Sequence, residues 1–258
     1  SISSQVLTYT LHHRIFYHTY VNCPRLSENI NSKIGCNFFM MFLEVIATNL
    51  EDCKIINQTN NVDRIELCSN LEHGGYTPPY TVIDQCCRTS EIPIRVMTRH
   101  TDEDFSCQQK QEFEKIKRDI AHIKKTTAEG IVTGIVSKNG EIDVPRMIEL
   151  IELAKPLNVT FHRAFDIVSD KLTAIKTLAE LGVSTVLTQG GEDVITNNLK
   201  VLNSLRGYNV QIQGGSGINL SNYQLVSNYC DAIHVGSAIR IDDTFNTGID
   251  INKLKLFK

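Results

Sequence analysis

Short apolar runs alternate with longer segments of helical period from residue 41 to the end of the chain. The apolar runs are rich in β-branched residues, which favour strands, and the longer segments repeat apolar residues at helical spacing. The predicted strands cover residues 41–46, 63–68, 94–98, 130–136, 158–162, 184–188, 209–213 and 231–236. The predicted helices lie near residues 50–58, 79–89, 108–127, 143–155, 170–181, 193–205, 219–228 and 250–257.

Residues that favour helix ends agree with this division. Asp143 suits a helix N-cap with Pro145 just inside, and Asn219 or Ser221 suits a later one. Gly182 suits a helix C-terminus. Eight strand–helix repeats imply parallel strands joined by crossover helices, and eight strands close a barrel. We therefore predict a single α/β domain with the (β/α)8 TIM-barrel fold.

A doubly wound open sheet is the alternative fold. It needs fewer strands and usually carries a glycine-rich phosphate turn after its first strand, which "EVIATNLED" lacks. The first 39 residues differ from the repeats, because "YTLHHRIFYHTY" is rich in aromatic residues and histidine without a clear period. We expect residues 1–39 to be an N-terminal extension, disordered or non-native, and residues 40–258 to be the barrel.

Composition narrows the class of protein. The 258 residues are 41% hydrophobic and 21% charged, as in a globular protein, and the net charge of -3 gives no reason to expect nucleic acid. No apolar run approaches the roughly 18 residues that span a bilayer, so no membrane partner is expected. The eight cysteines form no C-x-x-C pair, which favours reduced thiols and a cytoplasmic location.

Alternation along the strands predicts which side chains enter the barrel. Ile65 and Leu67 must face the helices, which sends Arg64, Glu66 and Cys68 inward. The same reasoning turns further side chains inward: Glu44, Arg95, Met97, Arg99, Thr160, His162, Thr188, Gln211, Gln213 and His234. Such a polar interior has two interpretations. In the first, the polar residues form an ion-pair network that fills the barrel, with arginines paired to Glu44 and Glu66. In the second, they form a ligand site at the carboxyl ends of the strands.

Two glycine-rich segments follow the last two strands. "QIQGGSGINLSN" and "HVGSAIR" place backbone N–H groups where barrel enzymes commonly bind phosphate. The anion-binding residues predicted there are Gly214, Gly215, Gly217, Gly236 and Ser237. The alternative is that these glycines only make tight turns.

Several motifs together resemble the CutC copper homeostasis family. They are "LEV", "VDRIELC", "GGYTPPY", "VMTR", "VTFHRAFD", "VLTQGG" and "GGSGI", over about residues 41 to 240. The resemblance implies a cytoplasmic TIM barrel linked to Cu(I). It places the family's cysteine at Cys68, whereas Ile46 stands where the family often has a second cysteine. Met97, with His162 or His234, would then complete a Cu(I) site. The arginine after strand three is kept as Arg99, but an acidic loop follows it.

Three functions remain open from the sequence. The first is Cu(I) binding or trafficking through Cys68, Met97 and His234. The second is an isomerase, lyase or hydrolase acting on a small, phosphorylated or otherwise anionic metabolite. Its candidate catalytic residues are Glu66, His162, Arg163 and Asp166, with Glu44, Arg64, Arg99, Thr188 and Gln213 as further ligand-binding residues. The third is a scaffold or homo-oligomer without chemistry.

Overall fold

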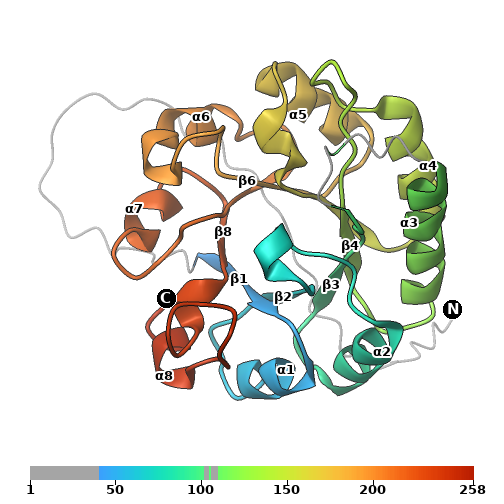
Figure 1. Cartoon of the computed structure of the whole chain (residues 1–258). Coiled ribbons are helices and arrows are strands. Elements are labelled where there is room, and N and C mark those ends of the chain that lie inside the picture. Colours follow the sequence, from blue (N-terminus) through green and yellow to red (C-terminus); the bar gives the residue numbers. More distant parts are fainter. Residues whose placement is uncertain (1–40, 102–104, 106–109) are drawn as a thin grey trace, which may run out of the picture. The chain divides into compact units, whose positions relative to one another are not determined.

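The protein is a closed barrel of eight parallel strands, ordered β1 to β8, with helices around it (Figure 1). The computed structural model describes residues 41–101, 105 and 110–258. The strands are β1 (Phe42–Ala47), β2 (Arg64–Leu67), β3 (Ile94–Met97), β4 (Gly130–Thr133), β5 (Asn158–Phe161), β6 (Thr185–Thr188), β7 (Gln211–Gly214) and β8 (Ala232–Val235). The predicted TIM-barrel fold is confirmed, and the open-sheet alternative is wrong. The predicted extension over residues 1–39 lies outside the described residues.

The helices surround the strands, and most begin within two residues of the predicted positions, but the sixth and seventh begin six and four residues later than predicted. They are α1 (Leu50–Ile56), α2 (Tyr80–Thr89), α3 (Lys110–Ile123), α4 (Val144–Ala154), α5 (Lys171–Glu180), α6 (Leu199–Ser204), α7 (Tyr223–Ser227) and α8 (Ile251–Leu254). Single 3-10 turns are η1 (Leu71–His73), η2 (Arg163–Ile167), η3 (Ile195–Asn197) and η4 (Ser237–Ile239). None of the helices in the described segments is both long and apolar enough to cross a membrane.

Helix ends explain where prediction and structure agree. Asp143 caps α4 by accepting a hydrogen bond from the Arg146 amide, and Gly182 follows α5 with a φ of +83°. The predicted cap of the seventh helix is wrong, because α7 begins at Tyr223. Asn219 instead accepts a hydrogen bond from the Ser221 amide at 2.9 Å and closes a turn ahead of that helix.

Polar side chains close the lower part of the barrel. The guanidinium of Arg95 donates to Thr160 Oγ1 at 2.7 Å and Thr185 Oγ1 at 2.9 Å, and it also donates to Glu129 at 2.6 Å. Every polar group in this layer therefore supports another strand of the barrel. This arrangement agrees with the network interpretation for Arg95 and leaves the opposite end of the barrel for a ligand.

The alternation predicted for β2 is correct. Ile65 and Leu67 are fully buried in the core between strands and helices, whereas Cys68 packs in a separate small cluster inside the barrel. That cluster also contains Ile46, Met97 and Val132 from β1, β3 and β4. The interior therefore has an apolar sector beside its polar one.

Candidate ligand site at the barrel mouth

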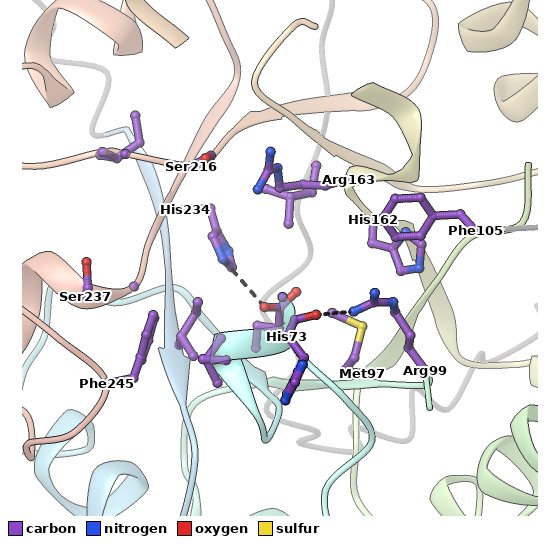
Figure 2. Close-up of a pocket in the computed structure, with 18 residues that line it drawn as sticks. His73, Met97, Arg99, Phe105, His162, Arg163, Ser216, His234, Ser237 and Phe245 are labelled. Carbon is purple, nitrogen blue, oxygen red and sulfur yellow. Dashed lines mark hydrogen bonds and ion pairs between the residues drawn. The ribbon is translucent and has the colours of Figure 1, made fainter. Parts of the chain in front are cut away.

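A cavity of about 330 Å³ lies at the carboxyl ends of the strands. Strand ends and the loops after them supply its walls, as barrel enzymes arrange their active sites. Figure 2 shows His162, Arg163 and Phe105 on one side of it and Ser237 and Phe245 on the other. Glu66 and His234 also line it, so residues from β2, β5, β8 and their loops meet at this point.

The layer below the cavity is a closed hydrogen-bond network. Neighbouring strands place Arg64 and His234 on either side of Glu44. Arg64 donates to Glu44 and, at 2.6 Å, to Gln213, and the Gln213 amide donates to Glu44 as well. His234 Nδ1 lies 2.7 Å from Glu44 Oε1. Burial acts to raise the pKa of Glu44, but the charge of Arg64 and the contacts of His234 hold that pKa well below its usual range.

Glu66 is the inward carboxylate without an arginine in contact. It is 2% exposed, its Oε1 has no hydrogen-bond partner among the described residues, and its Oε2 lies 3.5 Å from His234 Nε2. Burial raises the pKa of Glu66 to about 7. For His234, burial acts to lower the pKa, but the charge of Glu66 and the contact with Glu44 outweigh it and raise the pKa. These two groups form the floor of the cavity.

Cys68 and Met97, two residues of the predicted Cu(I) site, pack side by side, and Met97 lines the cavity while Cys68 does not. Cys68 is fully buried, does not line the cavity, and lies with Met97 under Gly75. Burial, together with the nearby charge of Glu66, raises the pKa of the Cys68 thiol well above its usual value. Within the described part of the chain, the one group of three ionisable metal donors is Glu44, Glu66 and His234, and it excludes Cys68. A thiol and a thioether are soft donors of the kind that Cu(I) prefers, but the Cys68 thiol does not reach the cavity.

The "VTFHRAFD" stretch divides into two functions. His162 and Arg163 line the cavity, while Asp166 holds the loop after β6. Asp166 accepts hydrogen bonds from Thr188 Oγ1 at 2.5 Å and from the Gln189 amide at 3.0 Å. Arg163 is braced by Asp166 at 2.9 Å and by Gln189 at 2.9 Å, through two of its three nitrogens. Asp166 therefore positions Arg163 rather than meeting a ligand.

His162 is a neutral group at ordinary pH. It is 4% exposed, and its Nδ1 accepts a hydrogen bond from the Ala164 amide at 3.1 Å, which leaves Nε2 to carry the proton. Burial, and then the charges of Arg99 and Arg163, lower the pKa of His162 to about 3. A pKa this low disfavours proton abstraction at neutral pH, and the catalytic role of His162 stays a prediction.

Thr188 does not point into the barrel, contrary to the prediction. Its hydroxyl lies between Asp166 and the Gly190 amide, and Leu187 lines the cavity in its place. The register pairs Leu187 with the inward Gln213 and Thr188 with Gly214, so the strand is one residue out of the predicted phase. Gly214 likewise faces the helices, where an added Cβ would lie 3.1 Å from Cys230 Sγ. Thr188 and Gly214 therefore both face away from the barrel interior.

The two glycine segments approach the cavity at Gly217, Gly236 and Ser237. Among the described residues, no acceptor takes the amide hydrogens of residues 216–218 or 236–238. Gly215 and Gly236 are needed for close packing, because an added Cβ would lie 2.5 Å from Leu187 and 2.8 Å from Phe245, respectively. These segments therefore leave backbone donors beside the cavity, on the far side from His162.

Arg99 adds a second guanidinium to the wall. It donates to the carbonyl oxygens of His73 at 2.7 Å and Gly75 at 3.2 Å, and it lies over the rings of Tyr76 and Phe105. The sequence analysis did not name eight other residues that line the cavity: Leu71, His73, Gly74, Phe105, Leu187, Ser216, Ile218 and Phe245. A lone aromatic residue within an otherwise polar loop was the available signal for Phe105 and Phe245.

A parallel barrel with a polar cavity at the carboxyl ends of its strands places this chain among the TIM-barrel proteins. The CutC family model matches residues 41–239, and the chain belongs to the CutC family. A family protein named CutC from Proteus mirabilis is 36% identical over 80% of this chain and 83% of its own length. A family protein named CutC from Edwardsiella ictaluri is 37% identical over 71% of this chain and 73% of its own length.

Solved structures agree with this assignment. The structure of CutC from Streptococcus agalactiae, named for copper homeostasis, covers 76% of this chain and 98% of its own, with a TM-score of 0.69 and 29% identity. A phosphoribosyl anthranilate isomerase from Thermococcus kodakaraensis covers 84% of this chain and 96% of its own, with a TM-score of 0.55. At 15% identity, the second likeness concerns the fold alone.

Proposed function

We propose that this CutC-family protein is a cytoplasmic enzyme that binds a small anionic metabolite, carrying a phosphate or carboxylate, in the barrel mouth. The observation that carries the proposal is the cavity at the barrel mouth, with two guanidinium groups and backbone amides that have no backbone acceptor in its wall. Guanidinium and amide donors together are the usual partners of phosphate and carboxylate oxygens. The cytoplasmic location is supported by the five described cysteines, all of which are free thiols.

The charges around the cavity determine how the ligand is oriented when it binds. Its anionic end belongs between Arg163 and the amides of Gly217 and Ser237, because no carboxylate lines that part of the cavity. The uncharged, reacting end then lies over Glu66 and His234 at the floor. A volume of about 330 Å³ suits a metabolite of a few carbon atoms. Isomerase, lyase and hydrolase chemistry all fit such a ligand.

Arg163→Met is expected to lower the affinity for inorganic phosphate about tenfold or more, because a hydrogen bond to a charged group contributes about 1.5–3 kcal/mol. Isothermal titration measures this loss. Arg206→Met is the matched control, since Arg206 is similarly exposed and pairs with Asp231 at 2.8 Å away from the mouth. Equal affinities for the two variants would contradict the assigned anion site.

Cu(I) binding through Cys68, Met97 and His234, suggested by the family name, is the second candidate. It is favoured by the contact of a thiol and a thioether inside the barrel. Cys68 is fully buried and does not line the cavity, which weighs against copper binding there. We therefore expect Cys68→Ser to leave Cu(I) affinity unchanged. Anaerobic titration against a chelating competitor checks this, with Cys230→Ser as the control at another buried thiol. A loss of affinity confined to Cys68→Ser would restore the copper site.

A further inference from the structure

His234 is held in the orientation of a metal-binding histidine. Its Nδ1 lies 2.7 Å from Glu44 Oε1, and Arg64 keeps that carboxylate ionised. A hydrogen on Nδ1 points at Glu44 in this arrangement, and Nε2 is the ring nitrogen that faces Glu66. A carboxylate behind the ring is the arrangement that fixes the tautomer of histidine ligands in metal sites. Glu44 has this supporting role, because its oxygens are already occupied by Arg64, Gln213 and His234.

The separation between His234 and Glu66 fits a shared ion better than a direct hydrogen bond. His234 Nε2 and Glu66 Oε2 lie 3.5 Å apart, whereas direct hydrogen bonds to oxygen are about 2.7–3.2 Å long. Two ligands at about 2.0–2.2 Å from one tetrahedral ion lie about 3.3–3.6 Å apart. The observed separation falls within that range, and both atoms belong to residues that line the cavity.

Glu66 supplies a second, independent observation. Its Oε1 is buried and has no hydrogen-bond partner among the described residues, although a buried carboxylate oxygen normally has one. The Cys68 thiol, 3.8 Å away, is the one donor recorded for its other oxygen. Arg64 is committed to Glu44 and Gln213, and Arg95 to the lower layer. A cation at the floor would satisfy this oxygen and neutralise the carboxylate.

We propose that the floor of the cavity binds one divalent first-row metal ion, such as Zn²⁺ or Mn²⁺, through His234 Nε2 and the carboxylate of Glu66. Imidazole nitrogen and carboxylate oxygen select such ions over Cu(I), which prefers sulfur. Two protein ligands leave the remaining positions open to the cavity, where water or the ligand would complete the coordination. This metal site deepens the proposed function. Coordination by the bound metabolite rests on that function, whereas binding of the ion by Glu66 and His234 does not.

The test is isothermal titration of the chelator-stripped full chain with Zn²⁺ and, separately, Mn²⁺. We expect one ion per chain, with the affinity lowered at least tenfold by Glu66→Gln and by His234→Asn, and unchanged by Cys68→Ser. Glu44→Gln is expected to weaken binding about 10- to 100-fold through the orientation of His234. Circular dichroism of each variant identifies any that fail to fold, and Glu66→Gln, which keeps the side-chain shape, is the variant that decides.

His12, His13 and His18 offer donors near the N-terminus, so each titration is repeated with all three replaced by Asn. No saturable binding in that background, or binding unaffected by both Glu66→Gln and His234→Asn, would overturn the inference. Phosphate titration of the metal-free chain is run alongside. If phosphate binding depends on Arg163 while no cation binds, the inference fails and the proposed function stands. If the cation binds and phosphate does not, the anion site alone fails.

Discussion

Glu44→Gln is expected to destabilise the barrel by about 3–5 kcal/mol, because it leaves the buried Arg64 without its counter-charge. Both side chains are almost completely buried, and Glu44 also accepts hydrogen bonds from Gln213 and His234. The loss therefore combines an unpaired buried cation with weakened contacts from β7 and β8. Urea denaturation at neutral pH measures it as a lower free energy of unfolding.

An exposed ion pair provides the control for this loss. Lys155 and Glu152 lie 2.6 Å apart with side chains 62% and 61% exposed, so Glu152→Gln should change the free energy of unfolding by less than about 1 kcal/mol. The double variant Glu44→Met/Arg64→Met should recover part of the stability, because it removes both buried charges. A loss below 1 kcal/mol for Glu44→Gln would show that the network does not hold the barrel together.

Acid pH is expected to remove about 5 kcal/mol of stability through His162 alone. The pKa of His162 is lowered from 6.5 to about 3 in the folded protein, so below pH 6.5 the unfolded chain binds a proton that the folded chain does not. The free energy of unfolding therefore falls by about 1.4 kcal/mol per pH unit between pH 6.5 and pH 3. The contribution is complete above pH 6.5 and absent below pH 3.

His162→Asn isolates this contribution, because the amide oxygen of asparagine can still accept from the Ala164 amide but does not titrate. The difference in the free energy of unfolding between wild type and variant should shrink steadily on acidification. Groups that titrate in both proteins, such as Glu44 and Glu66, cancel to first order. NMR of the labelled imidazole gives a direct reading. A His162 ring that becomes charged near pH 6.5 in the folded protein would refute this explanation.

The barrel was predictable because its signal is local. Apolar runs and helix caps recur along the chain, and the alternation at Ile65 and Leu67 correctly turned Glu66 and Cys68 inward. The same rule was wrong at Thr188, where counting began one residue out of phase. A threonine fits both the inside of a barrel and a position that donates to a buried carboxylate, as Thr188 does to Asp166. Its residue type therefore could not show that the predicted inward and outward positions of this strand were exchanged.

The pairing of charges could not be read from the sequence. The strands offered Arg64, Arg95 and Arg99 as partners for Glu44 and Glu66, and alternation places all of them inside. Which pairs form depends on the barrel register, which sets Arg64 beside Glu44 and sends Arg95 to Glu129. That Glu66 lies without an arginine partner, with one oxygen lacking a hydrogen bond among the described residues, is visible only once that register is known. Phe245 was missed for a related reason, since the path of its loop determines its contact with Gly236.

The crystal structure of the protein soaked with inorganic phosphate at millimolar concentration tests the central claim most directly. We expect tetrahedral density between Arg163 and the amides of Gly217 and Ser237, and no such density there in crystals of Arg163→Met. Density confined to surface lysines, or a mouth that holds only solvent in both crystals, would contradict the assignment of this cavity to an anionic metabolite.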